Sequence, residues 1–328
     1  MLQVIVWFLS VLLVSTKSVK EYQCFIFPFA NKCVLARVTY QPGQKIVFPV
    51  GYQHFRVDAV KHSSSISSNI TTLDDHLYEA MHRPAIIEMD HVQMRRLMLP
   101  ADLQTGSFAY NEISSLEVNY TQSYHINYLD LGSNQLSNIT NISALINLET
   151  LNLSRNGIEI IDELTFAPLV KLKRLYLKYN EFKTFPWKSL PSTLAHLDCS
   201  SGELESTDFK LLNLPALKYL NLEENKIISI NVSGILRGAP NLLEAYLFNR
   251  AISSHDMARI VEAFNHSTVY ESDQIWCYSD EEVVDGRCTK RRQVAISVWK
   301  AFLLAVVILV VGTLFVFVVY RTVKQNNL

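Results

Sequence analysis

The sequence predicts an α/β solenoid, in which short strands from successive units of the chain lie side by side in one parallel sheet. Two observations predict this fold class. An eleven-residue pattern, apolar at positions 1, 4, 6 and 11 with asparagine at position 9, recurs along the chain, and its sixth positions are 22 to 25 residues apart. Side chains at positions 4 and 6 point to the same face of a strand. One unit cannot bury this face alone, so successive units must stack.

The pattern occurs in complete and in altered copies. Four copies match every position: INYLDLGSNQL (126–136), LETLNLSRNGI (148–158), LKRLYLKYNEF (172–182) and LKYLNLEENKI (217–227). Three depart at one position: 194–204 has Gly202 and 242–252 has Arg250 in place of asparagine, and 103–113 has Gly106 at position 4. Upstream, we predict another copy over 84–94, with Val92 at position 9, and a strand over 52–60 that caps the open end of the sheet.

This spacing matches the leucine-rich repeat, whose units of about 20 to 29 residues each give a strand and a return segment and stack into a horseshoe with the sheet on its concave side. In the copy that begins at Leu148, the apolar residues Ile161, Phe166 and Leu169 extend the core around the convex side, as in the longer extracellular repeats. We predict leucine-rich repeats over 84–255.

Asparagine at position 9 has its own structural role. Just past each strand the chain turns, and backbone polar groups there would be buried without partners unless an inward amide side chain bonds them. The expected asparagine ladder consists of Asn111, Asn134, Asn156, Asn180 and Asn225.

Both ends of the chain carry membrane-targeting signals. Residues 1–18 are typical of a secretory signal peptide, although only the free amine supplies positive charge before the apolar run, so an uncleaved anchor is the alternative. Near the other end, twenty uncharged residues are enough to cross about 30 Å of hydrocarbon as a helix. We predict a transmembrane helix over 298–320 and a cytoplasmic tail over 321–328, because a buried core helix would show a polar face and a GPI signal would end in its apolar run.

Glycosylation acceptor sequences indicate a secretory route for the segment between these signals. They begin at Asn69, Asn119, Asn138, Asn141, Asn152, Asn231 and Asn265. The basic residues Lys290, Arg291 and Arg292 before the span would by themselves favour the inverted topology. We expect the signal peptide to decide instead, giving a single-pass type I protein of the plasma membrane with an extracellular ectodomain. The basic cluster itself either binds acidic lipid heads or glycans or is a solvated stalk.

The cysteines fit an oxidising compartment. Four of them permit three pairings, and we expect the local pairs Cys24 with Cys33 and Cys277 with Cys288, because a repeat array holds the two ends apart. The first pair belongs to an N-terminal cap over 19–83, and the second to a C-terminal cap and stalk over 256–297. Cys199 takes an inward strand position, which favours burial over a reactive or intermolecular thiol.

A helix is predicted at the start of the C-terminal cap. Met257, Ile260, Val261 and Phe264 recur at helical spacing on one face, and Ser254 or Asp256 provides its N-terminal cap. Such a helix would cover the last repeat.

Catalytic and nucleic-acid-binding signals are weak. The sequence holds no GxSxG, HExxH, GxGxxG or phosphate-binding glycine loop. Its nine histidines are scattered, and the groupings at 74–76 and 89–91 lack metal-ligand spacing. The net charge of −1 shows no basic excess. We therefore expect a chain that is not an enzyme and uses no cofactor, metal or nucleic acid.

The outward positions of the predicted strands form the candidate ligand-binding surface. Tyrosine is frequent there, and aromatic side chains on a rigid surface make good binding anchors. The alternative is that tyrosine is frequent because β-strands favour it. The candidates are Tyr128, Asp130, Arg174, Tyr176, Tyr179, His196, Asp198, Tyr219, Asn221, Tyr246 and Phe248. Asn152 faces the same side, and we hypothesise that a sugar there shields the centre and shifts binding toward the later repeats.

The order of features resembles the insect, especially mosquito, leucine-rich immune proteins, and is most similar to their membrane-anchored members. The resemblance covers the signal peptide, the short C...C segment, the LxxLxLxxNxL repeats, the terminal C...C segment and the single span. Soluble members of that family are innate-immune recognition factors that pair through cysteines and coiled coils and can hold complement-like proteins. This chain has no heptad region after Cys288 and no evident exposed spare cysteine, which places both properties in doubt.

The sequence also resembles Toll-type ectodomains, but a tail of eight residues cannot fold into a signalling domain. The resulting hypothesis is a cell-surface protein anchored in the lipid bilayer, whose concave face binds a protein or a microbial glycan in innate-immune recognition. Signalling would then need a co-receptor. The alternative is an adhesion or developmental surface protein.

Overall fold

The computed structural model of the 328-residue chain describes residues 19–25, 32–58, 68–264, 268–270, 281–284 and 287–290. The predicted signal peptide (1–18), transmembrane helix (298–320) and cytoplasmic tail (321–328) lie outside these ranges, as do Asn265, Cys277, Arg291 and Arg292. Within these ranges, none of the helices combines the length and the apolar character needed to cross a bilayer. The chain divides into two compact units, Met1–Glu271 and Ser272–Leu328.

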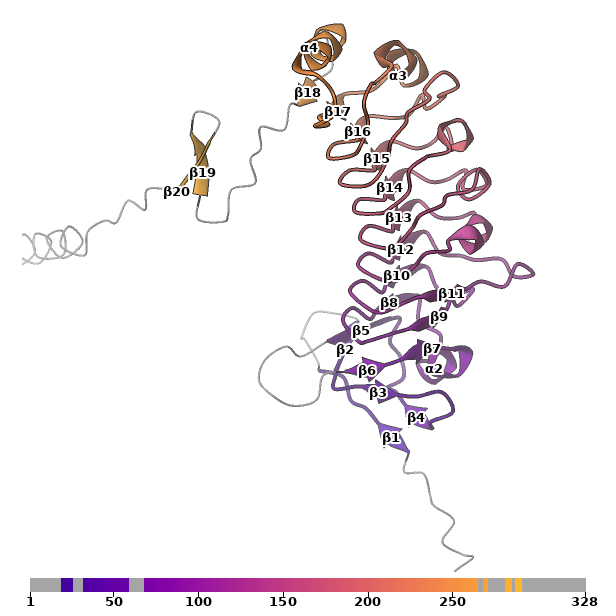
Figure 1. Ribbon diagram of the computed structural model, residues 1–328. Helices are drawn as coiled ribbons and strands as arrows, with labels where there is room; N and C mark the ends of the chain where they lie inside the picture. The colour runs from indigo at the N-terminus through magenta and orange to yellow at the C-terminus, as the bar shows by residue number, and fades with distance from the viewer. Residues whose placement is uncertain are drawn as a thin grey trace, which may run out of the picture. The chain divides into compact units, whose positions relative to one another are not determined.

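One long parallel sheet organises the first unit (Figure 1). Its eleven strands follow one another in chain order: β2 (Lys32–Ala36), β5 (His54–Asp58), β8 (Ile86–Glu88), β10 (Thr105–Ser107), β12 (Tyr128–Asp130), β13 (Thr150–Asn152), β14 (Arg174–Tyr176), β15 (His196–Asp198), β16 (Tyr219–Asn221), β17 (Glu244–Tyr246) and β18 (Thr268–Tyr270). In Figure 1, the return segments that carry α2 and α3 lie to the right of the strands. The predicted solenoid with a parallel sheet is confirmed.

The strands pair in register, so the middle residue of each strand stacks on the middle residue of the next. This row runs through Ile87, Gly106, Leu129, Leu151, Leu175, Leu197, Leu220 and Ala245. Its leucines are at most 1% exposed, and each contributes roughly 1.5 to 3 kcal/mol by leaving water. Gly106 fits because a Cβ there would lie 2.6 Å from Cε2 of Phe108, so this ring already fills the space.

The sheet extends beyond the range predicted for the repeats. The copy expected at 84–94 forms β8, and the strand expected at 52–60 forms β5. β5 is not the end strand, however, because β2 pairs along its full length on the other side. The segment around β2 keeps the apolar residues Cys33 and Leu35 but has no asparagine after them, and the sequence analysis did not recognise it as a copy.

The open edge of β2 is covered by the segment 19–25. Cys24 and Cys33 form a disulfide with a Cα–Cα distance of 5.0 Å, which confirms this predicted pair. Beside it, the amide of Phe25 donates to the carbonyl of Val34 at 2.8 Å in an antiparallel bridge. β1 (Lys20–Glu21) pairs with β4 (Ile46–Val47), and Tyr22 stacks on Phe48 with ring centroids 5.7 Å apart. These contacts close the N-terminal end of the apolar core.

Short elements outside the long sheet form the flanks and the return side of the unit. β7 (Thr72–Leu73), β9 (Arg96–Met98) and β11 (Ser115–Glu117) make a three-stranded parallel sheet, and β3 (Thr39–Tyr40) pairs with β6 (Asn69–Ile70). The helical elements are α2 (Asp75–Ala80), the 3₁₀ turns η1 (Thr140–Ala144) and η2 (Trp187–Ser189), α3 (Val232–Gly238) and α4 (Ser254–Ala263).

The helix predicted after the last repeat is α4, with two corrections. Its N-cap is Ser253, whose hydroxyl accepts from the amide of Asp256, so neither Ser254 nor Asp256 is the cap. Met257, Ile260 and Phe264 are buried as expected, whereas Val261 is 41% exposed because it lies at the edge of the apolar stripe. In the second unit, β19 (Glu281–Val284) and β20 (Arg287–Lys290) form an antiparallel hairpin that includes the backbone of Cys288. Its predicted bond to Cys277 lies outside the described residues.

Candidate ligand-binding surface

The asparagine ladder fixes the edge from which the outward side chains project. All five predicted amides are buried. Asn156 is typical: Nδ2 donates to the carbonyls of Leu131 and Leu153, both at 3.0 Å, and Oδ1 accepts from the amide of Leu136 at 2.9 Å. Asn111, Asn134, Asn180 and Asn225 make the corresponding bonds one repeat apart. Each amide thus joins two repeats.

Where the pattern loses its asparagine, the ladder changes in two different ways. In 242–252, the neighbouring Asn249 takes the role, donating to Leu222 and Leu247 and accepting from the amide of Asn225 at 2.8 Å. In 194–204, a Cβ at Gly202 would lie 3.0 Å from the carbonyl oxygen of Asn180. Glycine therefore allows the neighbouring backbone to approach. The inward Cys199 of this repeat is buried and unpaired, and burial raises the pKa of its thiol.

We use the term sheet face for the outward side chains of β2 through β17 and of the residues that follow each strand. Positions 3 and 5 of each repeat lie on it, as the alternation predicts. Of the predicted candidates, Tyr128, Arg174, Tyr179 and Phe248 are exposed, and Asn221 is buried. The remaining six are half-buried: Asp130, Tyr176, His196, Asp198, Tyr219 and Tyr246.

Four of these candidates form one continuous ring stack across β14, β15, β16 and β17. His196 and Tyr219 lie on register-paired positions with ring centroids 4.0 Å apart and planes inclined by 4°. Tyr176 follows on one side at 4.8 Å and Tyr246 on the other at 5.3 Å. The central pair is parallel, whereas the rings of Tyr176 and Tyr246 are tilted by 49° and 42° against their neighbours. We call these four residues the aromatic stack.

The groups around the aromatic stack keep it neutral near pH 7. Burial has the largest effect and lowers the pKa of His196. The charge of Asp198 has the next largest effect and raises this pKa, the charge of Arg174 lowers it, and that of Glu244 raises it. Burial raises the pKa of Tyr219 to about 12. Tyr219 accepts a hydrogen bond from Asn221 Nδ2 at 3.3 Å, so its phenol remains a donor. The stack therefore offers ring edges and hydroxyl groups without a charge of its own.

Tyr179 lies beside the aromatic stack but outside it. Its backbone adopts φ 58°, in the left-handed region, as does the residue before the asparagine in most repeats. The guanidinium carbon of Arg155 lies 3.9 Å from the centre of its ring, and Lys178 Nζ lies 4.9 Å from it. This tyrosine is therefore covered by two cations and contributes a basic margin to the sheet face.

The N-terminal part of the sheet face carries an ion network that the sequence analysis missed. Lys32 Nζ lies 2.9 Å from both carboxylate oxygens of Glu88, and His54 Nε2 lies 2.7 Å from Oε1. Arg56 approaches Oε2 of Glu88 at 3.7 Å and bonds Asp58 at 2.6 Å. Glu88 occupies position 5 of the copy at 84–94. Position 5 points outward, so the sequence could have placed Glu88 on the sheet face.

Between these two regions lies a hydrogen-bonded patch around Asn152. Asn152 Nδ2 donates to Asp130 Oδ1 at 2.9 Å, and the same oxygen accepts from the amide of Gly132 at 2.8 Å. A Cβ at Gly132 would lie 2.8 Å from Asn152 Nδ2. The amide nitrogen of Asn152 is therefore held against the neighbouring repeat and does not project freely from the sheet face.

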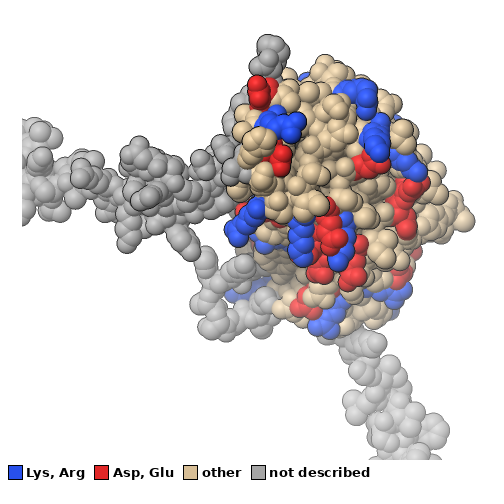
Figure 2. All heavy atoms as spheres, turned by 45° about the horizontal axis from the view of Figure 1, so that its top comes forward, with Lys and Arg blue, Asp and Glu red and all other residues tan. Residues whose placement is uncertain are grey.

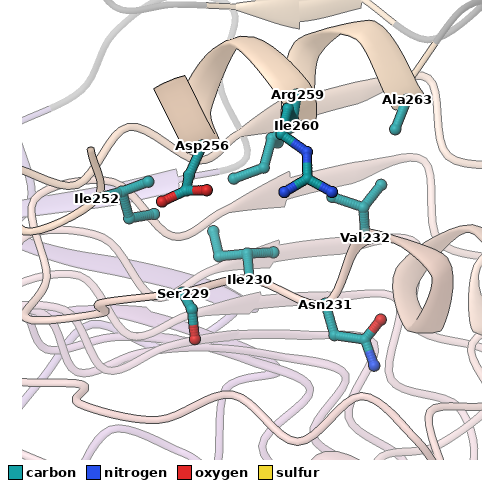
Figure 3. Close-up of a pocket in the computed structure, with 9 residues that line it drawn as sticks. All are labelled: Ser229, Ile230, Asn231, Val232, Ile252, Asp256, Arg259, Ile260 and Ala263. Carbon is teal, nitrogen blue, oxygen red and sulfur yellow. The ribbon is translucent and has the colours of Figure 1, made fainter. Parts of the chain in front are cut away.

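A separate cavity of about 310 Å³ lies between the loop before α3 and the helix α4 (Figure 3). Ile230, Val232 and Ile260 supply its apolar lining, and Asp256 and Arg259 project from α4 over it. None of the candidates predicted from the sequence as ligand-binding lines this cavity.

Across the described ranges, His, Cys, Asp and Glu side chains do not gather in groups of three or more that could hold a metal ion. Figure 2 shows acidic and basic side chains interspersed on the visible face.

Comparison with known proteins bears directly on the repeats. Residues 125–182 match the leucine-rich repeat family. This segment carries leucine-rich repeats. A segment of 121 residues, 32% of the chain, is 38% identical to Toll-like receptor 3 of Boselaphus tragocamelus but covers 13% of that receptor. A segment of 126 residues, 37% of the chain, is 29% identical to the leucine-rich repeats and immunoglobulin-like domains protein 3 of Homo sapiens and covers 11% of it.

Among solved structures, the chain is similar to the APL1 leucine-rich repeat domain. The TM-score is 0.53 at 18% identity, over 71% of this chain and 66% of that one. This similarity shows a shared fold. The aligned regions are a small part of the two curated relatives, so the activities of those whole proteins do not transfer with the repeats.

Proposed function

We propose that this leucine-rich repeat chain is a cell-surface binding protein that uses the aromatic stack on β14–β17 to dock a protein partner in innate-immune recognition. The observation that carries the proposal is the continuous contact of Tyr176, His196, Tyr219 and Tyr246. Rings held by one another and by a rigid sheet lose little conformational entropy when a partner binds, which is why rigid aromatic side chains make strong anchors.

The geometry of the stack favours a protein over a microbial glycan. Sugars bind aromatic side chains mainly by packing against the face of a ring, but the faces of His196 and Tyr219 are occupied by each other at 4.0 Å. This central pair leaves its ring edges and the phenol group of Tyr219 for a partner. Ring edges carry the positive part of the aromatic quadrupole, which suits carbonyl oxygens and carboxylates of a polypeptide. Arg174, Arg155 and Lys178 lie near by and suit the same acceptors.

The location is proposed on sequence features. A signal peptide at 1–18 and an apolar run at 301–320 support a type I protein anchored in the lipid bilayer. The disulfide between Cys24 and Cys33 agrees with an oxidising compartment. An immune role is further supported by the similarity of the repeats to those of Toll-like receptor 3. The alternative, a role in adhesion or development, uses the same binding surface.

The proposal is tested by comparing partners that the full chain captures on living cells. Wild type, Tyr219→Ala and Tyr120→Ala are expressed at equal surface level, cross-linked to bound proteins and analysed by quantitative mass spectrometry. Tyr120 is an exposed tyrosine on the flank, outside the stack, and provides the matched control. We expect a partner that Tyr219→Ala loses at least tenfold, about 1.4 kcal/mol of binding free energy, while Tyr120→Ala retains it. Equal capture by all three chains would refute the docking role of the stack.

Expression then separates the immune role from the alternative. Transcript levels that rise on microbial challenge support recognition, whereas levels that follow tissue patterning and ignore challenge support adhesion or development.

A further inference from the structure

The six glycosylation acceptor asparagines that the structure describes fall into two groups by the direction of their amide. In one group the protein holds the oxygen and leaves the nitrogen to solvent. In the other the nitrogen itself is bonded within the fold. The distinction matters because the nitrogen is the atom that a sugar must reach.

Asn119 and Asn138 belong to the first group. Both are exposed, and in each the amide oxygen accepts from the backbone nitrogen two residues later at 3.0 Å and from the threonine hydroxyl at the same position at 2.8 Å. Asn231 is also exposed, and its oxygen accepts from Ser233 Oγ at 2.8 Å while capping α3. In Figure 3 its nitrogen points away from the cavity. Among the described residues, none of these three nitrogens has a hydrogen-bond partner.

Asn141 and Asn152 show the opposite arrangement. Asn141 Nδ2 donates to the backbone carbonyl of Leu116 at 3.0 Å, while its oxygen accepts from the hydroxyl of Tyr120 at 2.8 Å. Asn152 Nδ2 donates to Asp130 at 2.9 Å and lies against Gly132. Both side chains are half-buried. Asn69 donates to the exposed side chain of Gln93, which is a weaker constraint than a buried partner, so the contrast rests on the other five.

We infer that Asn119, Asn138 and Asn231 carry N-linked glycans in the folded protein, whereas Asn141 and Asn152 keep free amides. In the transfer, Nδ2 forms a bond to C1 of the oligosaccharide and gives up one proton. The bond from C1 to the oxygen of a lipid-linked pyrophosphate donor breaks, and the pyrophosphate leaves with the electron pair. The inference depends on the proposed function only in assuming entry into the secretory route.

The consequence, for the five acceptors compared, is that none on the sheet face carries a sugar. This replaces the hypothesis that a glycan on Asn152 shields the centre of the surface. A sugar on Asn152 would have to displace the amide from Asp130 and push it away from Gly132, at a cost to the folded state. The glycans on Asn119 and Asn138 would instead cover one flank, since Tyr120 links the two loops by bonding Asn141.

The test uses one matched change at each acceptor, replacement of the hydroxyl residue two positions after the asparagine. The full chain, with a secretory signal from another protein placed in front, is produced in cultured cells, and the exported protein is compared by gel mobility before and after enzymatic removal of glycans. Thr121→Ala, Thr140→Ala and Ser233→Ala are each expected to remove the mass of one glycan. Ser143→Ala and Ser154→Ala, which leave Asn141 and Asn152 in place, are expected to leave the mobility unchanged.

Site-resolved glycopeptide mass spectrometry of the wild-type chain provides the second measurement and does not depend on any variant folding. Sugar on Asn152 or Asn141 in most exported molecules would overturn the inference, and so would bare Asn119 and Asn138. Because the added signal imposes the route, these outcomes are independent of whether the aromatic stack binds a partner, which the Tyr219→Ala experiment decides.

Discussion

The two ends of the sheet face share one backbone geometry and carry opposite chemistry. At β2, β5 and β8, Lys32 and His54 contact the carboxylate of Glu88 within 2.9 Å, so the charges neutralise one another. At β14 through β17, neutral rings contact one another and leave edges and hydroxyl groups at the surface. A partner would have to break ion pairs to bind at the first region, whereas the second region offers neutral aromatic side chains. The solenoid thus determines where the outward side chains lie. The types of these side chains determine which end of the sheet face can bind a partner.

The largest effect is expected where the two ends depend on the same core. Leu197 lies directly beneath the aromatic stack and Ile87 beneath the ion network, and both are fully buried. Leu197→Ala and Ile87→Ala should each lower the free energy of unfolding by about 2 to 5 kcal/mol, because each leaves a cavity in the row of stacked residues. Urea denaturation of the purified full chain provides the measurement. If only one of the two variants lost stability, the two ends of the sheet would not share an equivalent core.

A second comparison concerns the ladder, which is incomplete at the charged end. Val92 takes the asparagine position there, and its amide is instead bonded by Asn111 Oδ1 at 2.8 Å. Asn180→Val near the aromatic end would leave the carbonyl of Leu177 without its donor and the backbone amide of Ile158 without its acceptor, whereas the carbonyl of Leu153 would keep Asn156. We expect a loss of roughly 1 to 3 kcal/mol in the free energy of unfolding. Val92→Ala, which removes only apolar atoms, is the control for volume. Equal losses from both changes would show that packing, and not hydrogen bonding, is what Asn180 contributes.

The sequence predicted the features that follow from the repeating pattern. Positions 4 and 6 of the pattern predicted the buried row, and position 9 predicted the asparagines that the structure places in the ladder. These predictions were possible because a residue at a given position has the same neighbours in every unit. The outward positions gave the sheet face for the same reason. The N-terminal end was only partly predicted because its strands lack the pattern. Glu88 meets Lys32 and His54 across 56 and 34 residues, and nothing local in the sequence announces such contacts.

Other features of the sheet face could not be predicted from the repeating pattern, because they depend on side-chain conformations. The tyrosines were predicted as separate anchors, but their stacking depends on the rotamers of four side chains and on His196 lying between two of them. Asn249 takes the ladder position one residue early, which strict counting excludes. The acceptor sequence at Asn152 is identical in kind to that at Asn231, and only the hydrogen-bond partner of the nitrogen separates them.

A smaller effect tests the charged end alone. Burial opposes ionisation of Glu88, but the hydrogen bonds and charges of Lys32 and His54 outweigh it and hold the pKa of this carboxyl below its ordinary value. Glu88→Gln should lower the free energy of unfolding by about 1 kcal/mol at neutral pH. A depressed folded-state pKa contributes stability above the unfolded value of about 4.3 and loses it as the pH falls through the folded value. The gap between wild type and variant should therefore narrow in acid.

Urea denaturation of both chains over a pH series measures this gap. Glu112→Gln, which removes a more exposed partner of Arg95, is the matched control and should have little effect at any pH. A gap for Glu88→Gln that widens as the pH falls would contradict the assignment of a depressed pKa.

The smallest expected effect tests the aromatic end. Burial lowers the pKa of His196, so the unfolded chain, with a histidine pKa of about 6.5, takes up the proton first as the pH falls. Wild type should therefore lose a few tenths of a kcal/mol relative to His196→Phe between neutral pH and the folded pKa, since phenylalanine keeps a ring but cannot titrate. His125→Gln, at an exposed site, is the control variant. If wild type instead gained stability on acidification, Asp198 and Glu244 would dominate over burial and Arg174, and the stack would carry a positive charge that the neutral docking surface proposed above does not allow.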